Sequence, residues 1–226
     1  MTDEARLDLH VHSRHSPDSR TTVEAIVMQA MEAGLRGIAL TDHNTVRGLA
    51  KLAELQKKYP RYLLVPGVEV SAHEGHVLAY GLSETPPRGR LVAETVDWVE
   101  ARGGVAVVAH PFRRNHGVGE RIAREARIDA LEVRNGHNSE IANARAELIA
   151  AQRHLGTTGG SDAHAPHEVG RAYTVVPEPV STLDDLLDHL RRRETRAEGA
   201  SLTPWGQFRV GMRSAFLRVG RGFRSI

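Results

Sequence analysis

Short hydrophobic runs alternate with longer amphipathic segments along most of the chain. The runs predict strands, and apolar residues at three- and four-residue spacing predict helices. The predicted strands are residues 7–12, 37–40, 63–70, 76–80, 105–109, 130–133, 157–160 and 173–176. The predicted helices are residues 23–33, 45–58, 91–102 and 138–154, the first capped by Thr21 or Thr22 and ended by Gly34. Strands separated by helices of this length indicate an α/β fold with parallel pairing and active-site loops at the carboxyl ends of the strands.

Many of these strands lie next to a residue that can bind a metal ion. In LDLHVHS, alternation places Asp8, His10 and His12 on one face of a strand, where two imidazoles can share a cation and Asp8 can orient them. This pair alone is weak evidence, because a chain with 13 histidines produces such a pair by chance. Similar settings recur in GIALTDHN, LLVPGVEVS, GHVLAYGL, GVAVVAHPF and TTGGSDAH. The candidate ligands are His10, His12, Asp18, His43, Glu69, His76, His110, Asp162 and His164.

A buried cluster of this kind is costly unless a metal ion compensates its charges, so a purely structural cluster is disfavoured. The chain has no cysteine, which excludes thiolate zinc sites and a cysteine nucleophile. The His and carboxylate set suits divalent Mn, Zn, Fe or Co. Ligand type alone does not choose among these metals.

The chain resembles the polymerase and histidinol phosphatase (PHP) family of metallo-phosphoesterases over roughly residues 5–177. The resemblance rests on DLHVHS, SPDS, TDHN, PGVEVS, the His of GHVLAYG, AHPF, EVRNG and GSDAH, in the family's order. It implies a distorted (β/α)7 TIM-like barrel with up to three metal ions at the carboxyl ends of the strands. Some members insert a long lid between the ligands that correspond to His76 and His110. Only 33 residues lie between them here, so no cap domain is expected.

Carried over residue by residue, the resemblance assigns each candidate ligand to one of three metal ions. The first would be held by His10, His12, Glu69 and Asp162. Glu69 would bridge to a second, held by His76 and His110, and the third would be held by Asp18, His43 and His164. Members of the family place either Asp or His near Asp18. We favour Asp18 over the nearby His15 because its SPDS setting matches better.

The implied activity is hydrolysis of a phosphate ester by a hydroxide that bridges two metal ions. The substrate would be a nucleotide, another small phosphomonoester or an oligonucleotide end. The expected catalytic residues are Glu69, His10, His12 and Asp162. Candidates for binding the substrate phosphate are Arg113, Arg134, Arg171 and His137, because each lies near a proposed metal loop and Arg suits bidentate contact with phosphate. Glu132 is expected to orient a ligand histidine or to face the barrel interior.

Length and charge divide the chain into a barrel domain at residues 1–190 and a basic tail at residues 191–226. The tail carries nine Arg and two Glu, a balance of +7, whereas residues 1–190 carry 21 basic and 26 acidic residues, a balance of −5. Apolar residues of the tail recur at helical spacing at Trp205, Phe208, Met212, Phe216, Val219 and Phe223. This stripe could contact the barrel, another subunit, nucleic acid or an anionic membrane surface. We favour packing on the barrel or a second subunit.

No apolar run reaches the roughly 18 residues that span a bilayer, and the first six residues lack the apolar region of a signal peptide. A cytoplasmic enzyme is therefore expected. The alternative is an accessory or nucleic-acid-binding module with a structural metal cluster. The complete ligand set favours the enzyme, because a degenerate domain would have lost some of these residues. The same ligands suit a phosphatase and an exonuclease equally.

Overall fold

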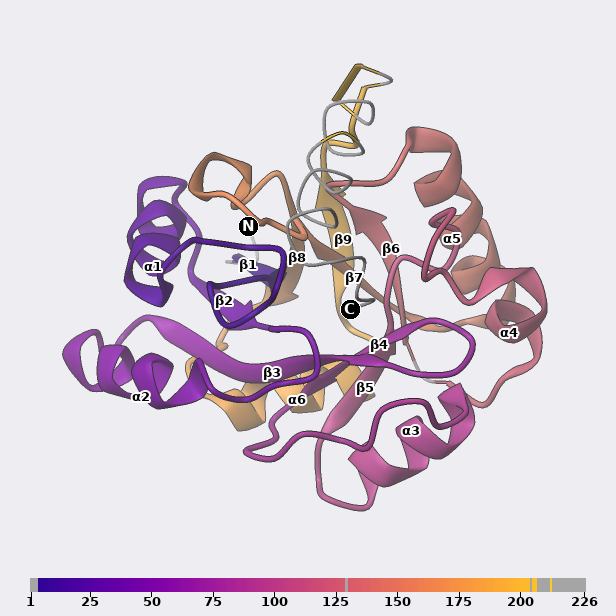
Figure 1. Cartoon of the computed structure of the whole chain (residues 1–226), viewed down its shortest axis with the longest axis horizontal. Coiled ribbons are helices and arrows are strands. Elements are labelled where there is room, and N and C mark those ends of the chain that lie inside the picture. Colours follow the sequence, from indigo (N-terminus) through magenta and orange to yellow (C-terminus); the bar gives the residue numbers. More distant parts are fainter. Residues whose placement is uncertain (1–3, 129, 204, 207–211, 213–226) are drawn as a thin grey trace.

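The computed structural model describes residues 4–128, 130–203, 205, 206 and 212. Within these residues the strands are β1 Glu4–Val11, β2 Gly37–Leu40, β3 Leu63–Ser71, β4 His76–Tyr80, β5 Val105–Val108, β6 Ala130–Asn135, β7 Gly156–Gly160, β8 Ala172–Pro177 and β9 Arg196–Gly199. The helices are α1 Val23–Glu32, α2 Leu49–Lys58, α3 Val92–Glu100, α4 Gly119–Glu125, α5 Glu140–Arg153 and α6 Leu183–Arg191. Figure 1 shows α1 to α5 arranged around the strands.

The strands form one mixed sheet in the order β7-β6-β5-β4-β3-β2-β1-β8-β9. β1, β2 and β3 are parallel neighbours, and so are β5, β6 and β7. β4 is antiparallel to β3 and β5, β8 is antiparallel to β1, and β9 is antiparallel to β8. The parallel pairing expected for strands separated by helices is therefore confirmed for β1–β3 and for β5–β7, and it is wrong for β4 and β5, which α3 separates.

The short link between β3 and β4 explains the reversal. Only residues 72–75 connect the two strands, whereas a parallel crossover needs about a dozen residues or more. β4 must therefore run back along β3. As a result its first residue, His76, lies at the same end of the barrel as the carboxyl ends of β3 and β5.

The two ends of the curved sheet approach each other, so the barrel is nearly closed. The main-chain N–H of Gly159 in β7 donates to Thr174 Oγ1 in β8 at 2.9 Å. Beyond β7, Asp162 N donates to His10 O at 2.7 Å and His12 N donates to Ala163 O at 2.9 Å. The expected α/β barrel is confirmed, as a nearly closed mixed sheet of nine strands with six helices in the described part of the chain, and only α3 and loops lie between His76 and His110.

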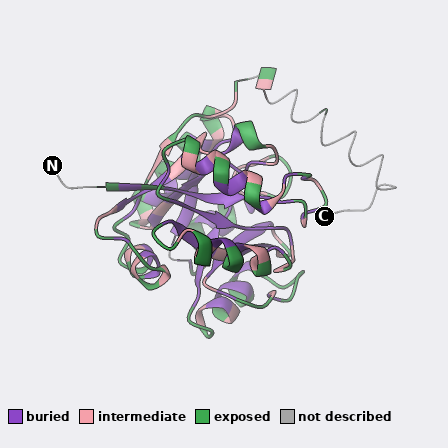
Figure 2. Ribbon diagram, turned by 90° about the vertical axis from the view of Figure 1, so that its left-hand side faces the viewer, coloured by how far each residue is buried: buried purple, intermediate pink, exposed green. Residues whose placement is uncertain are grey.

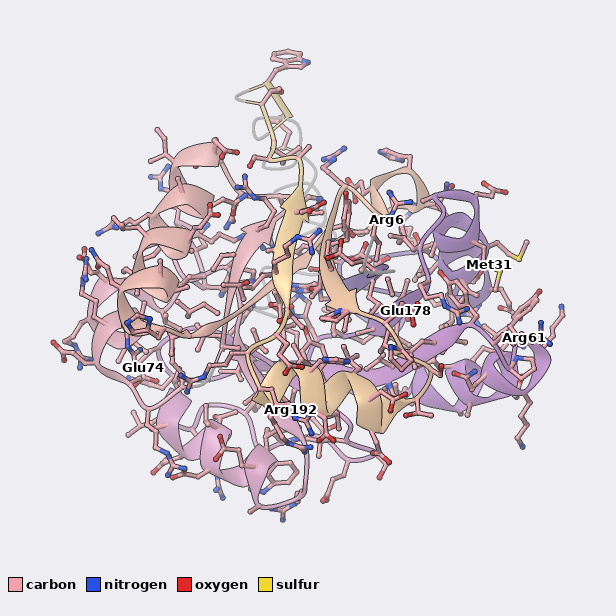
Figure 3. The ribbon with its side chains drawn as sticks, turned by 180° about the vertical axis from the view of Figure 1, so that it is seen from behind. Arg6, Met31, Arg61, Glu74, Glu178 and Arg192 are labelled. Atoms are coloured by element: carbon pink, nitrogen blue, oxygen red, sulfur yellow. The ribbon has the colours of Figure 1, made fainter. Side chains whose placement is uncertain are left out.

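Three buried apolar groups hold this barrel together. α1 and α2 cover β1, β2 and β3 from outside, and α3, α4 and α5 cover β3 to β6. α6 closes one end, because Leu186, Leu187 and Leu190 pack with residues of the strands such as Leu7 and Tyr80. α6 lies behind the strands in Figure 1 and faces the reader in Figure 3, close to the labelled Arg192. Figure 2 shows buried strands and helices whose outer faces are exposed.

The predicted elements match the observed ones except at a few positions. Thr22 caps α1, with its side chain accepting from Ala25 N at 3.2 Å. The helix predicted over 45–58 begins only at Leu49. The short α4, α6 and β9 were not predicted. β9 has the sequence RAEG, which lacks a hydrophobic run, and it forms by pairing with β8.

The segment at 191–226 contributes to the described sheet through β9. There Arg196 pairs with Glu4, with 2.6 Å between Nη1 and Oε1. In the predicted apolar stripe Trp205 and Met212 are exposed, and Phe208, Phe216, Val219 and Phe223 lie outside the described residues. No helix in the described part of the chain is long and apolar enough to cross a membrane.

Candidate metal centre

The nine candidate ligands gather at the end of the barrel opposite α6. His10 and Glu69 belong to β1 and β3, and His76 begins β4. The other candidates lie in the loops after β1, β2, β5 and β7, namely His12, Asp18, His43, His110, Asp162 and His164. All are buried except Asp18 and His164, which are half-buried. A cluster of this burial requires internal compensation of its charges.

Four of these side chains, the predicted catalytic residues, form a first group. The Nε2 atoms of His10 and His12 lie 3.1 Å apart. Glu69 Oε2 lies 3.4 and 3.3 Å from these two atoms, and Asp162 Oδ1 lies 3.6 and 3.2 Å from them. Four ligand atoms placed tetrahedrally about 2.1 Å from one ion are about 3.4 Å from each other. The spacing of the first group therefore fits a single cation.

Hydrogen bonds on the far side of both rings turn their lone pairs toward this point. His10 Nδ1 donates to Glu132 Oε1 at 2.9 Å, so Nε2 of the neutral ring carries a lone pair. His12 Nδ1 lies 3.1 Å from Ser16 Oγ, which donates its own hydrogen to Asp42 Oδ1 at 2.9 Å. His12 Nδ1 is therefore also a donor. Two lone pairs and two carboxylate oxygens that face one point are complementary to a cation.

Glu69 connects this point to a second group through its other oxygen. Oε1 lies 2.7 Å from His76 Nδ1 and 2.9 Å from His110 Nε2. Among the described residues, His76 Nε2 and His110 Nδ1 are buried without a hydrogen-bond partner. Buried polar atoms are rarely left without a partner. These two nitrogens are not the ones that face Glu69. The nitrogens that face it, His76 Nδ1 and His110 Nε2, lie close to the same carboxylate oxygen and make the second group a candidate position for an ion.

Asp18 lies between two imidazoles in a third group. Its Oδ2 is 3.2 Å from His43 Nε2 and 3.0 Å from His164 Nε2. His164 Nδ1 donates to the carbonyl oxygen of Asp162 at 2.7 Å, so Nε2 of the neutral ring presents a lone pair to the carboxylate. His43 Nδ1 lies 2.9 Å from Glu69 Oε2, yet neither atom finds hydrogen-bond geometry among the described residues. The donor set thus fits a cation here as well.

The buried charges shift each other's pKa values strongly. Burial by itself would raise the pKa of Glu69, but His76, His43 and His10 hold it well below its usual value. Burial would lower the pKa of His43, but Glu69 and Asp18 raise it to about 10. Without metal ions the cluster retains protons at neutral pH. Ions that enter it must displace those protons.

Two candidate ligands have left-handed backbone conformations that are uncommon outside glycine. The φ angle is 26° at His110 and 56° at Asp162. Such conformations cost about 1–3 kcal/mol each and persist where surrounding contacts fix them. The contacts here are His110 N donating to Glu132 Oε2 at 2.9 Å and Asp162 N donating to His10 O at 2.7 Å. These two bonds fix the turns that direct both side chains into the cluster, and the bond from Asp162 N also helps to close the barrel.

Glu132→Gln is predicted to weaken metal binding, because Glu132 holds both His10 and the main chain of His110. The amide keeps the shape but loses the charge and one acceptor. We expect the apparent metal affinity to fall by about 10–100-fold, measured by competition with a chromogenic chelator. Glu147→Gln is the matched control, because Glu147 lies on α5 and pairs with Arg134. Equal affinity in the two variants would contradict the orienting role.

Two of the four candidate substrate-binding residues lie at the cluster. Arg113 Nη2 contacts Asp162 Oδ2 and donates to Asn135 Oδ1 at 2.7 Å. His137 stacks on His164, with ring centroids 5.5 Å apart. Both side chains can therefore reach a molecule bound at the metal centre.

The other two candidates lie elsewhere. Arg134 pairs with Glu140 and Glu147 of α5, at 2.9 and 3.3 Å, so its side chain leaves β6 toward the helix and not toward the cluster. Arg171 directly precedes β8 and has no ion-pair partner among the described residues. It lies at the edge of the ligand loops and not among the ligands.

Asp8, expected to orient the imidazoles, contacts the main chain of His10 and neither ring, because its Oδ1 accepts from His10 N at 3.3 Å. Its Oδ1 accepts from Ser161 N at 2.9 Å, and its Oδ2 accepts from Gly170 N at 2.8 Å. A register shift between Asp8 and Val11 interrupts the alternation of β1. Burial raises the pKa of Asp8 to about 6 although these donors lower it. Asp8 therefore holds the main chain of the loop between β7 and β8 through Ser161 and Gly170.

Three residues of the loops around the cluster, His15, Ser16 and His116, are not among the nine candidate ligands. His15, the alternative to Asp18, lies with its ring near Gly48. Ser16, which holds His12, was not predicted, and its one sequence signal is its place in SPDS. His116 was also not predicted. It stacks on His76 with centroids 4.7 Å apart, and the motif AHPF in the same loop ends before it, at Phe112.

Comparison with known proteins gives matches along most of the chain. A model of the PHP domain matches residues 8–152, and a model described as PHP-associated matches residues 140–195. An uncharacterized protein of Methanocaldococcus jannaschii is 30% identical over 146 residues, which cover 60% of this chain and 84% of the relative. Among solved structures, a two-domain protein of Bacteroides vulgatus containing a predicted PHP-like metal-dependent phosphoesterase has a TM-score of 0.74 at 22% identity. That match covers 88% of this chain and 65% of the other.

Two further relatives carry names that state an activity. The 3',5'-nucleoside bisphosphate phosphatase of Chromobacterium violaceum is 25% identical over 261 aligned residues, covering 74% of this chain and 90% of the relative. The 5'-3' exoribonuclease Rnm of Escherichia coli is 30% identical over 118 residues, covering 43% of this chain and 40% of the relative. The domain model alone spans more than half of the chain, and the observed barrel agrees with it. The chain therefore belongs to the PHP domain family.

Proposed function

We propose that the protein is a metal-dependent phosphoric ester hydrolase. The observation that carries this proposal is the first group, in which two imidazole lone pairs and two carboxylate oxygens face one point at the separations a cation requires. Glu69 contacts imidazoles of all three groups. The activities in the names of the bisphosphate phosphatase and the exoribonuclease support phosphoester hydrolysis for this chain as well.

The residues divide among two or three divalent ions. His10, His12, Glu69 and Asp162 would hold the first, because both carboxylates lie close to both imidazoles. His76 and His110 with Glu69 would hold the second, and Asp18, His43 and His164 the third. Such ions lower the pKa of a bound water and neutralise charge on phosphoryl oxygens. The nitrogen and oxygen donors suit Mn, Zn or Fe.

Arg113 supplies a fixed positive charge beside this centre. Its Nη2 is engaged by Asp162 and Asn135, and its Nε donates to Asn138 Oδ1 at 3.3 Å. Its Nη1 has no partner among the described residues, and the side chain is 25% exposed. A guanidinium held on one edge can donate from its free edge to a phosphoryl oxygen. We therefore assign Arg113 to substrate binding, with His137 beside it.

The test is hydrolysis of p-nitrophenyl phosphate, a nucleoside 3',5'-bisphosphate and a short single-stranded oligonucleotide, with and without Mn2+. We expect turnover of at least one substrate, loss of activity on chelation, recovery with Mn2+, and two or three metal equivalents by elemental analysis. The double variant His10→Ala, His12→Ala should stay folded by circular dichroism and be inactive, which excludes a contaminating phosphatase. A metal-loaded protein that hydrolyses none of these substrates would support the accessory module instead.

A further inference from the structure

An irregularity in β6 decides which of its last side chains reach the metal centre. Regular alternation along the strand would place Glu132 and Arg134 on the same face. Between these two residues, however, β6 advances by two residues while its partner β7 advances by one. Such a bulge re-aims the side chains that follow it. Arg134 therefore turns outward to α5, which lies beside β6 in Figure 1, and Asn135 turns inward beside Glu132.

The side-chain amide of Asn135 is fully used by residues at the metal centre. Its Nδ2 donates to Glu132 Oε2 at 2.9 Å and to Asp162 Oδ2 at 3.3 Å. Its Oδ1 accepts from Arg113 Nη2 at 2.7 Å and from His137 N at 2.9 Å. An amide offers two donor hydrogens and two acceptor lone pairs, so none is left over. The reversed amide would face two carboxylates with its oxygen, and the contacts therefore allow one orientation.

Asn135, Arg113 and Asp162 form a closed set of contacts. Arg113 Nη2 contacts Asp162 Oδ2, which is the oxygen that Asn135 Nδ2 also reaches. The other oxygen of Asp162 stays with the imidazoles, 3.6 Å from His10 Nε2 and 3.2 Å from His12 Nε2. Asn135 thus joins the guanidinium that we assign to the substrate to the carboxylate that we assign to the first metal ion.

Asn143 of α5 fixes the main chain of Asn135 from the opposite side. Its Oδ1 accepts from Asn135 N, and its Nδ2 donates to Asn135 O, each at 3.1 Å. Asn143 also bonds to Asn138 Nδ2 at 3.1 Å and to Ser201 Oγ at 2.9 Å. Asn135 and Asn143 are completely buried. A buried polar network with all its bonds made holds one arrangement. The position of the Asn135 amide is therefore set by the fold before any ligand binds.

We propose that Asn135 is a positioning residue that holds Arg113 in the orientation needed to meet a phosphoryl oxygen. This inference rests on the proposed function and adds a physical link between its substrate site and its metal site. Without Asn135, Arg113 keeps only the contact with Asp162 and the 3.3 Å bond to Asn138. The guanidinium could then turn onto the carboxylate of Asp162. A small loss of orientation at a phosphate-binding group lowers the rate strongly.

The experiment is a double-mutant cycle of Asn135→Ala and Arg113→Ala, measured as kcat/KM on the best substrate at saturating Mn2+. Each single substitution should lower kcat/KM by about 10–100-fold. Because Asn135 acts through Arg113, the double variant should lie within about threefold of Arg113→Ala alone. A merely structural role of Asn135 would instead multiply the two losses.

Two further variants guard this result against a general loss of structure. Asn135→Asp keeps the shape of the side chain, and it replaces Asn135→Ala if circular dichroism shows that the alanine variant is unfolded. Its second carboxylate oxygen would face Asp162 and Glu132, so kcat/KM should fall at least as far. Gln56→Ala is the matched control. Gln56 also bonds to main-chain atoms, at Tyr59, Tyr62 and Leu64, but it lies on α2 away from the cluster. It should lower Tm and leave kcat/KM unchanged.

Calorimetric titration of the Mn2+-loaded protein with inorganic phosphate gives a readout without turnover. Asn135→Ala and Arg113→Ala should each raise the Kd of phosphate, and the double variant should bind like Arg113→Ala. Multiplied losses in the double variant, or wild-type kcat/KM and phosphate affinity in the folded Asn135 variants, would overturn the inference. If chelator-sensitive hydrolysis persists in that case, the proposed function stands. A wild type that hydrolyses no phosphoester, with the non-additive loss of phosphate affinity intact, would refute the proposed function alone.

Discussion

Glu69→Gln is expected to lower kcat/KM by well over 100-fold, beyond the roughly 10–100-fold typical of a residue that only orients a ligand. Glu69 is the one carboxylate among the described candidates that contacts all three groups. Oε1 faces His76 and His110, and Oε2 faces His10, His12 and His43. An amide has one neutral oxygen for these contacts and turns an NH2 group toward the rest. Glu69→Gln therefore weakens metal binding at all three groups, whereas substitution of most other candidate ligands affects one group.

The measurement is kcat/KM on the best substrate together with elemental analysis of the same preparation. Metal content should fall together with activity. Glu132→Gln is the comparison, because it removes a buried carboxylate of similar setting that contacts imidazole Nδ1 of His10 and no other ring. If Glu69→Gln keeps its full complement of metal and wild-type turnover, the shared role of Glu69 is wrong.

Metal binding is expected to strengthen steeply with pH. The pKa of His43 rises from 6.5 to about 10 in the metal-free fold, because the attraction of Glu69 and Asp18 exceeds the effect of burial. A divalent ion must displace this proton. The apparent affinity should therefore rise about tenfold per pH unit for each proton displaced, up to about pH 10. Calorimetric titration with Mn2+ at pH 6.5, 7.5 and 8.5 in buffers of different ionisation enthalpy measures both the affinity and the proton release.

The raised pKa of His43 also determines how the stability of the metal-free protein changes with pH. A histidine with a raised pKa stabilises the metal-free protein below about pH 6.5, and this contribution is lost as pH rises toward 10. The difference in Tm between metal-loaded and chelated protein should therefore widen from pH 6.5 to 9. His43→Ala should reduce the slope, while His189→Ala should not, because His189 pairs with Glu194 outside the cluster. An affinity independent of pH would contradict displacement of protons.

The sequence predicted the fold well because hydrophobic runs report strands directly. The runs at 63–70 and 76–80 differ from β3 and β4 by at most one residue. Their antiparallel relation was not predicted, although the short link of 72–75 implies it. β9 was not predicted, because it forms through its pairing with β8 and its sequence has no strand-like composition.

The candidate ligands were found through residue type, position after strands and the family motifs, and the structure brings them together. Their roles as metal ligands stay predictions. The backbone conformations and ring orientations of the candidate ligands could not be predicted from the sequence, because they depend on contacts between residues distant in sequence. The left-handed turn at His110 depends on Glu132, and the orientation of His12 depends on Ser16 and Asp42. Arg134 was misleading for the same reason, since its partners Glu140 and Glu147 belong to the next helix.

The closure of the barrel between β7 and β1 also bears on how the protein is made. His10 and His12 emerge early in synthesis, but Asp162 reaches them only when its N–H bonds to the carbonyl of His10. Contacts between residues so far apart in sequence form late in folding. A partly synthesised chain thus presents unpaired histidines without the carboxylate that completes their set. The four side chains of the first group therefore come together only in a barrel that has closed between β7 and β1.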